Sequence, residues 1–144
     1  MPAFPVSHIN LQPDIRLRRV EACLPLLDGW MRLAEDAGIP VFIETHRDRM
    51  TTDLFFTLDL LDRRPELPLL ADLSHFLVGR EFAFPVDEEN HAHIRRILRN
   101  ARAFHGRVAS REDRNYLSAP PALGRSLPAM VGPWSSSLAI PRRR

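Results

Sequence analysis

Four short apolar runs recur along the first 108 residues of this 144-residue chain, and they constrain its fold more than any other feature. They start about thirty residues apart, at His8–Gln12, Val41–His46, Leu69–His75 and Ala103–Val108. The segments between them carry apolar residues at three- and four-residue steps, which is typical of amphipathic helices. Short strands that alternate with helices at this spacing predict repeated βα units and a parallel sheet. We therefore expect an α/β fold with about four strands and three helices.

The helices have recognisable start and stop signals. We expect them over residues 14–37, over residues 51–64, and from residue 87 onward. Gly38 should end the first helix, because glycine adopts the left-handed conformation common after a helix C-terminus. Thr51 or Thr52 should cap the second helix, and Pro65 should stop it. The third helix should begin near Asp87, where acidic residues suit the positive end of the helix dipole.

Charge is distributed unevenly along the chain. Residues 1–113 contain 15 Arg and all 18 acidic residues, which gives −3, whereas residues 114–144 contain 5 Arg and no acid, which gives +5. The acidic body argues against a nucleic-acid partner. No apolar run approaches the roughly 20 residues that span a bilayer, and residues 1–6 lack the pattern of a signal peptide. We therefore expect no membrane partner and a cytoplasmic location.

The periodic pattern stops after Val108. The remaining sequence is rich in Pro, Gly and Ser and ends in three arginines, with no helical or strand period. We expect a folded domain over residues 1–112 and an irregular tail over residues 113–144, either disordered or encoded out of frame. An intact reading frame that encodes the same tail in close relatives would contradict the out-of-frame hypothesis.

Acid and imidazole groups follow two neighbouring apolar runs. Glu44 and His46 end the second run, and Asp72 and His75 end the third. In parallel α/β folds ligands bind outside the carboxyl ends of the strands, so these side chains should lie at one site. A carboxylate that follows three apolar strand residues needs a partner when it is desolvated, and a metal cation would supply one.

Simpler interpretations of the two acids stay open at this point. Glu44 could form an ion pair with a nearby arginine such as Arg47 or Arg49. Asp72 could be a surface acid beside Ser74, with Ser74 capping a helix. The Asp-x-x-His spacing alone is weak evidence for a site. The evidence is stronger here because this spacing follows the Glu-x-His strand end by one βα unit.

Five further residues are candidates for a site or for a structural role. His46 is equally a packing residue or a ligand. His105 and Arg107 share one face of the fourth apolar run, where imidazole could bind a metal and arginine could hold an anionic or hydroxyl-rich substrate. His105 could also be a packed core residue. His91 and His93 lie two residues apart in a helical segment, so we expect them to be solvated.

Three motifs together resemble a known family. The runs Glu44–Asp48, Ala71–His75 and Phe104–Arg107 resemble the xylose-isomerase-like TIM-barrel superfamily, and within it the sugar phosphate isomerases/epimerases. The resemblance covers roughly residues 6–112 and aligns the four apolar runs with strands four to seven of the barrel. It implies a partial, half TIM barrel without strands one to three and without strand eight.

The resemblance also implies a chemistry. It implies a divalent metal ion (Mn²⁺, Mg²⁺, Co²⁺ or Zn²⁺) and a small sugar or sugar-phosphate substrate, with Asn10 or Gln12 near that substrate. Proton transfer next to a carbonyl would proceed through a metal-stabilised enediolate. The roles carried over are metal ligands Glu44, Asp72 and His105; catalytic residues Glu44 and His75; and substrate-binding residues His46, His75 and Arg107.

This chain departs from the family pattern at the strand-eight glutamate, which it lacks. We therefore leave open whether it is an enzyme, and expect weak or no activity from a metal-dependent isomerase/epimerase in this form. Two alternatives are an inactive barrel remnant that only folds or associates, and a metal-dependent phosphodiesterase of the apurinic-endonuclease type. The open edges of a partial sheet also predict a possible homo-oligomer.

Overall fold

The computed structural model describes residues 6–15, 19–79, 85–106, 108–110 and 113–116, and in this part the predicted α/β fold is confirmed. A four-stranded sheet has the order β1-β2-β3-β4, and every pair is parallel. Its strands are β1 (Ile9–Leu11), β2 (Val41–Glu44), β3 (Leu69–Ala71) and β4 (Ala101–Phe104). The described helices are α1 (Val20–Ala37), α2 (Leu54–Arg63), α3 (Ser74–Gly79) and α4 (Glu88–Asn100).

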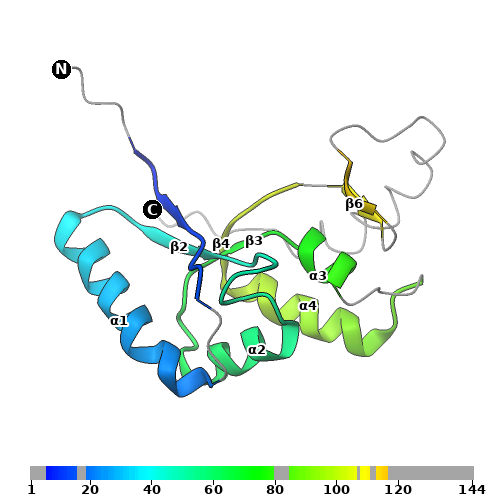
Figure 1. The fold of residues 1–144 in the computed structure, drawn as a ribbon, viewed down its shortest axis with the longest axis horizontal. Helices are drawn as coiled ribbons and strands as arrows, with labels where there is room; N and C mark the ends of the chain where they lie inside the picture. Colours follow the sequence, from blue (N-terminus) through cyan, green and yellow to red (C-terminus); the bar gives the residue numbers. More distant parts are fainter. Residues whose placement is uncertain (1–5, 16–18, 80–84, 107, 111–112, 117–144) are drawn as a thin grey trace.

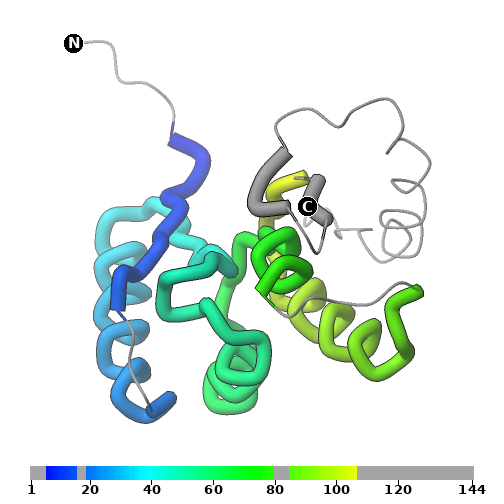
Figure 2. The backbone as a smooth tube through the Cα atoms, turned by 45° about the vertical axis from the view of Figure 1, so that its right-hand side comes forward, coloured from blue at the N-terminus to red at the C-terminus, as the bar shows by residue number. Residues whose placement is uncertain are grey.

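The long helices form a layer on one side of the sheet (Figure 1). α1 contacts α2, and α2 contacts α4, so the helices follow one another in the same order as the strands (Figure 2). When strands are added in sequence order, right-handed crossovers place every helix on the same face of the sheet. This one-sided arrangement is that of an arc of a βα barrel, whereas a doubly wound sheet carries helices on both faces.

The hydrophobic core lies between the sheet and the helix layer. Ile43 and Leu69 are register partners on neighbouring strands, and both belong to the buried core cluster. Leu54 and Leu60 from α2 and Ile94 and Ile97 from α4 are also fully buried in this cluster. The next register partners, Glu44 and Leu70, point to the opposite face because side chains alternate along a strand. The sheet therefore separates an apolar face from a face that carries the acid.

Helix boundaries match the predicted signals at three of five places. Gly38 ends α1 with a φ of 65°, Asp87 caps α4, and α2 stops before Pro65. The predicted N-cap of α2 was wrong, because Asp53 rather than a threonine accepts the hydrogen bond from the Phe56 amide at 2.8 Å. The first helix also begins later than predicted, at Val20, because Arg19 has an extended backbone.

The third and fourth strands differ from the predicted segments. β3 ends at Ala71, and the chain then forms the short helix α3, which was not predicted, so His75 lies in a helix rather than in a strand. β4 directly follows α4 and ends at Phe104, before the predicted end at Val108. Val108 instead belongs to β5 (Val108–Ser110), which pairs antiparallel with β6 (Asp113–Tyr116).

The proposed domain boundary at residue 112 lies between β5 and β6 and stays a prediction, and residues 117–144 lie outside the described part. Cys23 is fully buried in the core, as a small apolar residue would be. Within the described residues, no helix is both long and apolar enough to cross a membrane.

Candidate metal centre

Glu44 is the central acid of the site. It is the last residue of β2, and none of its surface is exposed. Its Oε2 accepts hydrogen bonds from the Asn10 side-chain amide at 2.6 Å and from the Gln12 side-chain amide. Burial alone would raise the pKa of Glu44, but these two hydrogen bonds and the charges of His105 and His46 together lower it below its ordinary value. The surroundings therefore favour an ionised carboxylate.

Asp72 follows β3 and is also fully buried. The Thr45 hydroxyl fixes its backbone: the Asp72 amide donates to Thr45 Oγ1 at 2.8 Å, and Thr45 Oγ1 donates to the Asp72 carbonyl at 3.1 Å. Asp72 Oδ1 accepts from the Ser74 amide at 3.2 Å and from the Ser74 hydroxyl. These bonds orient the other oxygen, Oδ2, so that it lies 3.7 Å from His75 Nε2 and 3.5 Å from His105 Nδ1.

His105 brings an imidazole that lies close to both acids. Its backbone amide donates to the Ala71 carbonyl at 3.0 Å, which continues the β3–β4 pairing by one residue. Its Nδ1 lies 3.1 Å from Glu44 Oε1 and 3.5 Å from Asp72 Oδ2. The side chain is 37% exposed, so one side of the cluster can be reached from solvent.

Glu44, Asp72 and His105 have the composition and spacing of a divalent-cation site. Their donor atoms all lie within 4.8 Å of one another. Ligand atoms that each lie about 2.0–2.2 Å from one ion are separated by roughly 3–3.5 Å, close to the His105 distances. Two buried carboxylates repel each other unless a proton or a cation lies between them. The residues that the resemblance assigned to the metal therefore form a group able to hold one.

His46 and His75 form a second group with the same acid. Glu44, His46 and His75 also place one donor atom each within 4.8 Å of one another. The two imidazole rings have centroids 4.0 Å apart and are tilted by 45°. His75 lies in the first turn of α3 and is 3% exposed, whereas His46 follows β2 and is partly exposed. His46 and His75, two of the three residues predicted for substrate contact, thus lie beside Glu44, which is predicted for the metal.

The simpler interpretations of these residues fit the described contacts less well. Arg49 pairs with Asp14 at 3.3 Å, and the described partners of Glu44 are amides and an imidazole. Asp72 does bond to Ser74, but it is buried rather than at the surface. His105 is too exposed for a core residue. Arg107, the predicted substrate-binding arginine, lies outside the described residues.

The contacts of Asn10 and Gln12 with Glu44 were only weakly indicated by the sequence. Asn10 and Gln12 were expected near the substrate, and in the structure they contact Glu44 itself. Asn10 lies on β1 and Gln12 directly follows the strand, two residues on, so the register of β1 with β2 places both on the side of the acid. The predicted solvation of His91 and His93 is wrong for His93, which is 24% exposed and packs edge-on against Phe55 with ring centroids 5.3 Å apart.

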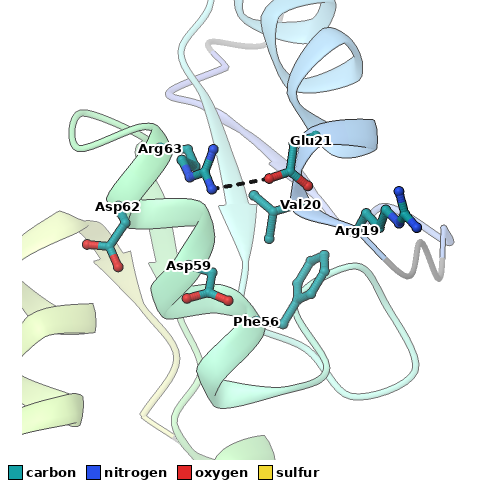
Figure 3. Close-up of a pocket in the computed structure, with 7 residues that line it drawn as sticks. All are labelled: Arg19, Val20, Glu21, Phe56, Asp59, Asp62 and Arg63. Atoms are coloured by element: carbon teal, nitrogen blue, oxygen red, sulfur yellow. Dashed lines mark ion pairs between the residues drawn. The ribbon is translucent and has the colours of Figure 1, made fainter.

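Two cavities in the described part of the chain lie away from these residues. One of about 420 Å³ lies between the start of α1 and α2, where Glu21 and Arg63 form an ion pair at 3.2 Å (Figure 3). Another of about 410 Å³ lies at the amino ends of the strands and is lined in part by Pro40, Pro68 and Arg102. The donor set at the carboxyl ends is what marks the candidate site.

Comparison with protein-family models, with curated proteins and with solved structures gave no match for this chain.

Proposed function

We propose that this protein binds a divalent metal ion and catalyses, weakly, proton transfer next to the carbonyl of a small sugar or sugar phosphate. The proposal follows the resemblance to sugar phosphate isomerases/epimerases. One observation carries it: Glu44, Asp72 and His105 stand at the carboxyl ends of three neighbouring parallel strands and bring their donor atoms within 4.8 Å. A bound divalent ion would polarise the substrate carbonyl and its neighbouring hydroxyl.

The residues around the metal ligands suit complementary roles. Asn10 and Gln12 hold Glu44 Oε2, so they would fix the direction of the carboxylate. Glu44 and His75 are the residues that we propose for moving the proton, because Glu44 belongs to the ligand set and His75 is buried next to it. His46 is partly exposed and would contact the substrate at the rim, and Arg107 remains a predicted substrate contact outside the described residues. Activity would be weak because a second acid–base glutamate is missing from the motif set.

Metal binding is the first test. Isothermal titration with Mn²⁺ should give one ion per chain, and Glu44→Gln and Asp72→Asn should each weaken binding at least about tenfold, because each removes a charged ligand. Matched controls are Glu35→Gln on α1 and Asp59→Asn on α2, two exposed acids whose loss should leave the affinity unchanged. Equal affinity in all four variants, or no binding to the folded wild type, would refute the metal centre.

Catalysis is the second test, and it separates an enzyme from a remnant. A panel of ketoses and ketose phosphates is incubated with the Mn²⁺-loaded protein in D₂O, and proton NMR follows loss of the signal next to the carbonyl. Exchange that disappears in Glu44→Gln supports the proposal. Stoichiometric metal without exchange on any substrate would favour an inactive barrel remnant. Cleavage of an abasic-site oligonucleotide would instead favour the phosphodiesterase.

A further inference from the structure

We propose that Glu44, His46 and His75 form a second divalent-cation subsite, which shares Glu44 with the first and prefers Zn²⁺. The inference rests on the proposed metal role of Glu44 and gives the two histidines a different task from substrate contact. Its starting observation is that these three residues bring one donor atom each within 4.8 Å, as the first group does. The two groups have only Glu44 in common.

The tautomer of His46 suits a ligand. His46 Nδ1 lies 2.5 Å from the Arg47 carbonyl oxygen, and a carbonyl oxygen can only accept a hydrogen bond. Nδ1 of the neutral ring therefore carries the proton, and Nε2 carries the lone pair. A histidine that binds a metal through one nitrogen commonly donates the other N–H to a backbone carbonyl, which fixes the ring. His46 already makes that supporting bond.

The turn after β2 fixes His46 relative to Glu44. The His46 amide donates to Thr51 Oγ1 at 3.0 Å, and the same hydroxyl donates to the Glu44 carbonyl at 2.5 Å. Thr51 is fully buried, so this bridge is shielded from water. His75 approaches from α3, a different element, and is 3% exposed. Glu44 and His75 therefore come from packed parts of the structure, and the Thr51 bridge fixes the turn that carries His46.

Glu44 has enough acceptor capacity to be shared. An ionised carboxylate offers about four lone-pair sites. The amides of Asn10 and Gln12 use two of them, and His105 Nδ1 lies at a third. An ion in the first group would replace the His105 contact to Glu44, and an ion in the second would use the remaining site. Two amide donors and two ions together would use the roughly four lone-pair sites of the Glu44 carboxylate.

The two donor sets differ in the metal that they favour. The first set has two carboxylates and one imidazole, and such oxygen-rich sites suit Mn²⁺ and Mg²⁺. The second set has one carboxylate and two imidazoles, a combination that catalytic zinc sites use with water as the fourth ligand. Imidazole ligands also favour Zn²⁺ over Mn²⁺ in the general order of divalent affinities. We therefore expect Zn²⁺ to fill both subsites and Mn²⁺ to fill one.

Equilibrium dialysis followed by elemental analysis of the full chain tests this. The wild type should hold two Zn²⁺ but one Mn²⁺ per chain, His46→Gln and His75→Gln should each hold one Zn²⁺, and both should keep the wild-type Mn²⁺ affinity. His91→Gln on α4 is the matched control and should still hold two Zn²⁺. One Zn²⁺ in the wild type, or two in His46→Gln, would overturn the second subsite alone. No Zn²⁺ or Mn²⁺ in the folded wild type would overturn the proposed function as well.

A second measurement needs no variant, in case a substitution prevents folding. Co²⁺ is added to the wild type and followed by electron paramagnetic resonance. Two ions that share one carboxylate couple magnetically, so the signal should grow with the first equivalent and fall in intensity per ion with the second. A signal that rises linearly through two equivalents would show separate ions and would overturn the shared subsite.

Discussion

The Thr51 hydroxyl should contribute far more to stability than the hydroxyl of its neighbour, Thr52. Thr51 is fully buried and bridges the Glu44 carbonyl at 2.5 Å and the His46 amide at 3.0 Å. Thr51→Val keeps the shape of the side chain but leaves both backbone groups without this partner. A buried carbonyl without its hydrogen bond costs about 1–3 kcal/mol, and the partly buried amide costs about 0.5–1.5 kcal/mol. The expected loss is about 2–4 kcal/mol of unfolding free energy.

Thr52→Val is the control for this substitution. Thr52 is exposed, and its hydroxyl accepts a single hydrogen bond, from the Asp48 amide at 3.0 Å. We expect a loss below about 1 kcal/mol, as for most surface substitutions. Urea unfolding followed by circular dichroism and by tryptophan fluorescence measures both variants, and coincident curves would support a two-state analysis.

The difference between the variants is large enough to measure. If the free energy of unfolding falls by about 2 kcal/mol per molar urea, Thr51→Val should lower the urea concentration at the unfolding midpoint by about 1–2 M. Thr51→Val should also weaken Zn²⁺ binding at the second subsite, because it releases the turn that holds His46, while Mn²⁺ binding changes less. Midpoints of the two variants within about 0.3 M of each other would refute the assigned role of the Thr51 bridge.

Three further predictions concern stability. The hydrogen bond from Arg64 lowers the pKa of Asp28 below its ordinary value of 3.8. The ionised Asp28 therefore stabilises the folded state above pH 3.8, and this stabilisation is lost as the pH falls through the folded-state pKa. The difference in melting temperature between wild type and Asp28→Asn should therefore be constant at higher pH and close below pH 3.8; a gap that widens in acid would contradict this sign. Ile97→Ala on α4 should cost about 2–5 kcal/mol because Ile97 is fully buried, whereas Leu33→Ala, at 66% exposed, should cost below about 1 kcal/mol in the same urea assay. Asp53→Ala should cost about 1 kcal/mol through loss of the α2 cap, and a neutral result in urea unfolding would mean that the cap is replaced by water.

The alternation of strands and helices could be predicted because it depends on the period of the apolar residues alone. The helix ends at Gly38 and before Pro65, and the cap at Asp87, follow from the local chemistry of single residues. These features need no knowledge of distant contacts, so the sequence was sufficient for them.

The start of α2 shows where local signals fail. Thr51, Thr52 and Asp53 are all favourable N-cap residues, and three candidates in a row leave the boundary undetermined. In the structure Thr51 bridges Glu44 and His46, and Thr52 accepts from the Asp48 amide. The threonine hydroxyls are engaged in the turn after β2, so Asp53 is the residue that caps the helix. Tertiary contacts, rather than propensity, decided this boundary.

Two other differences have geometric causes. α3 spans only six residues, which is too few for a helical period to be distinguished from the end of an apolar strand. β4 begins immediately after α4, without a loop, and its exposed residues Arg102 and Phe104 alternate with small alanines. The apolar signal of that strand is therefore weak, and the predicted segment was displaced towards Val108.

The proximity of Glu44, Asp72 and His105 could be predicted because the carboxyl ends of neighbouring parallel strands meet at one edge. The supporting contacts could not, since the amides of Asn10 and Gln12 reach Glu44 only through the parallel register of β1 with β2. A sequence pattern identifies the residue types at each strand end, but the orientation of each side chain depends on strand lengths and on the turns that follow.

The same site that would bind metal also couples distant parts of the chain. Glu44 and His105 are separated by 61 positions, and their contact requires β3 to pair with both β2 and β4. Hydrogen bonds and the nearby histidines already favour the ionised form of Glu44, and a cation between Glu44 and Asp72 would further offset the cost of burying two carboxylates at that meeting point. An ion that binds the folded chain alone stabilises it in proportion to the logarithm of the ion concentration. Metal binding and assembly of the four-stranded sheet should therefore be thermodynamically linked, with β4 as the strand whose pairing completes the ligand set.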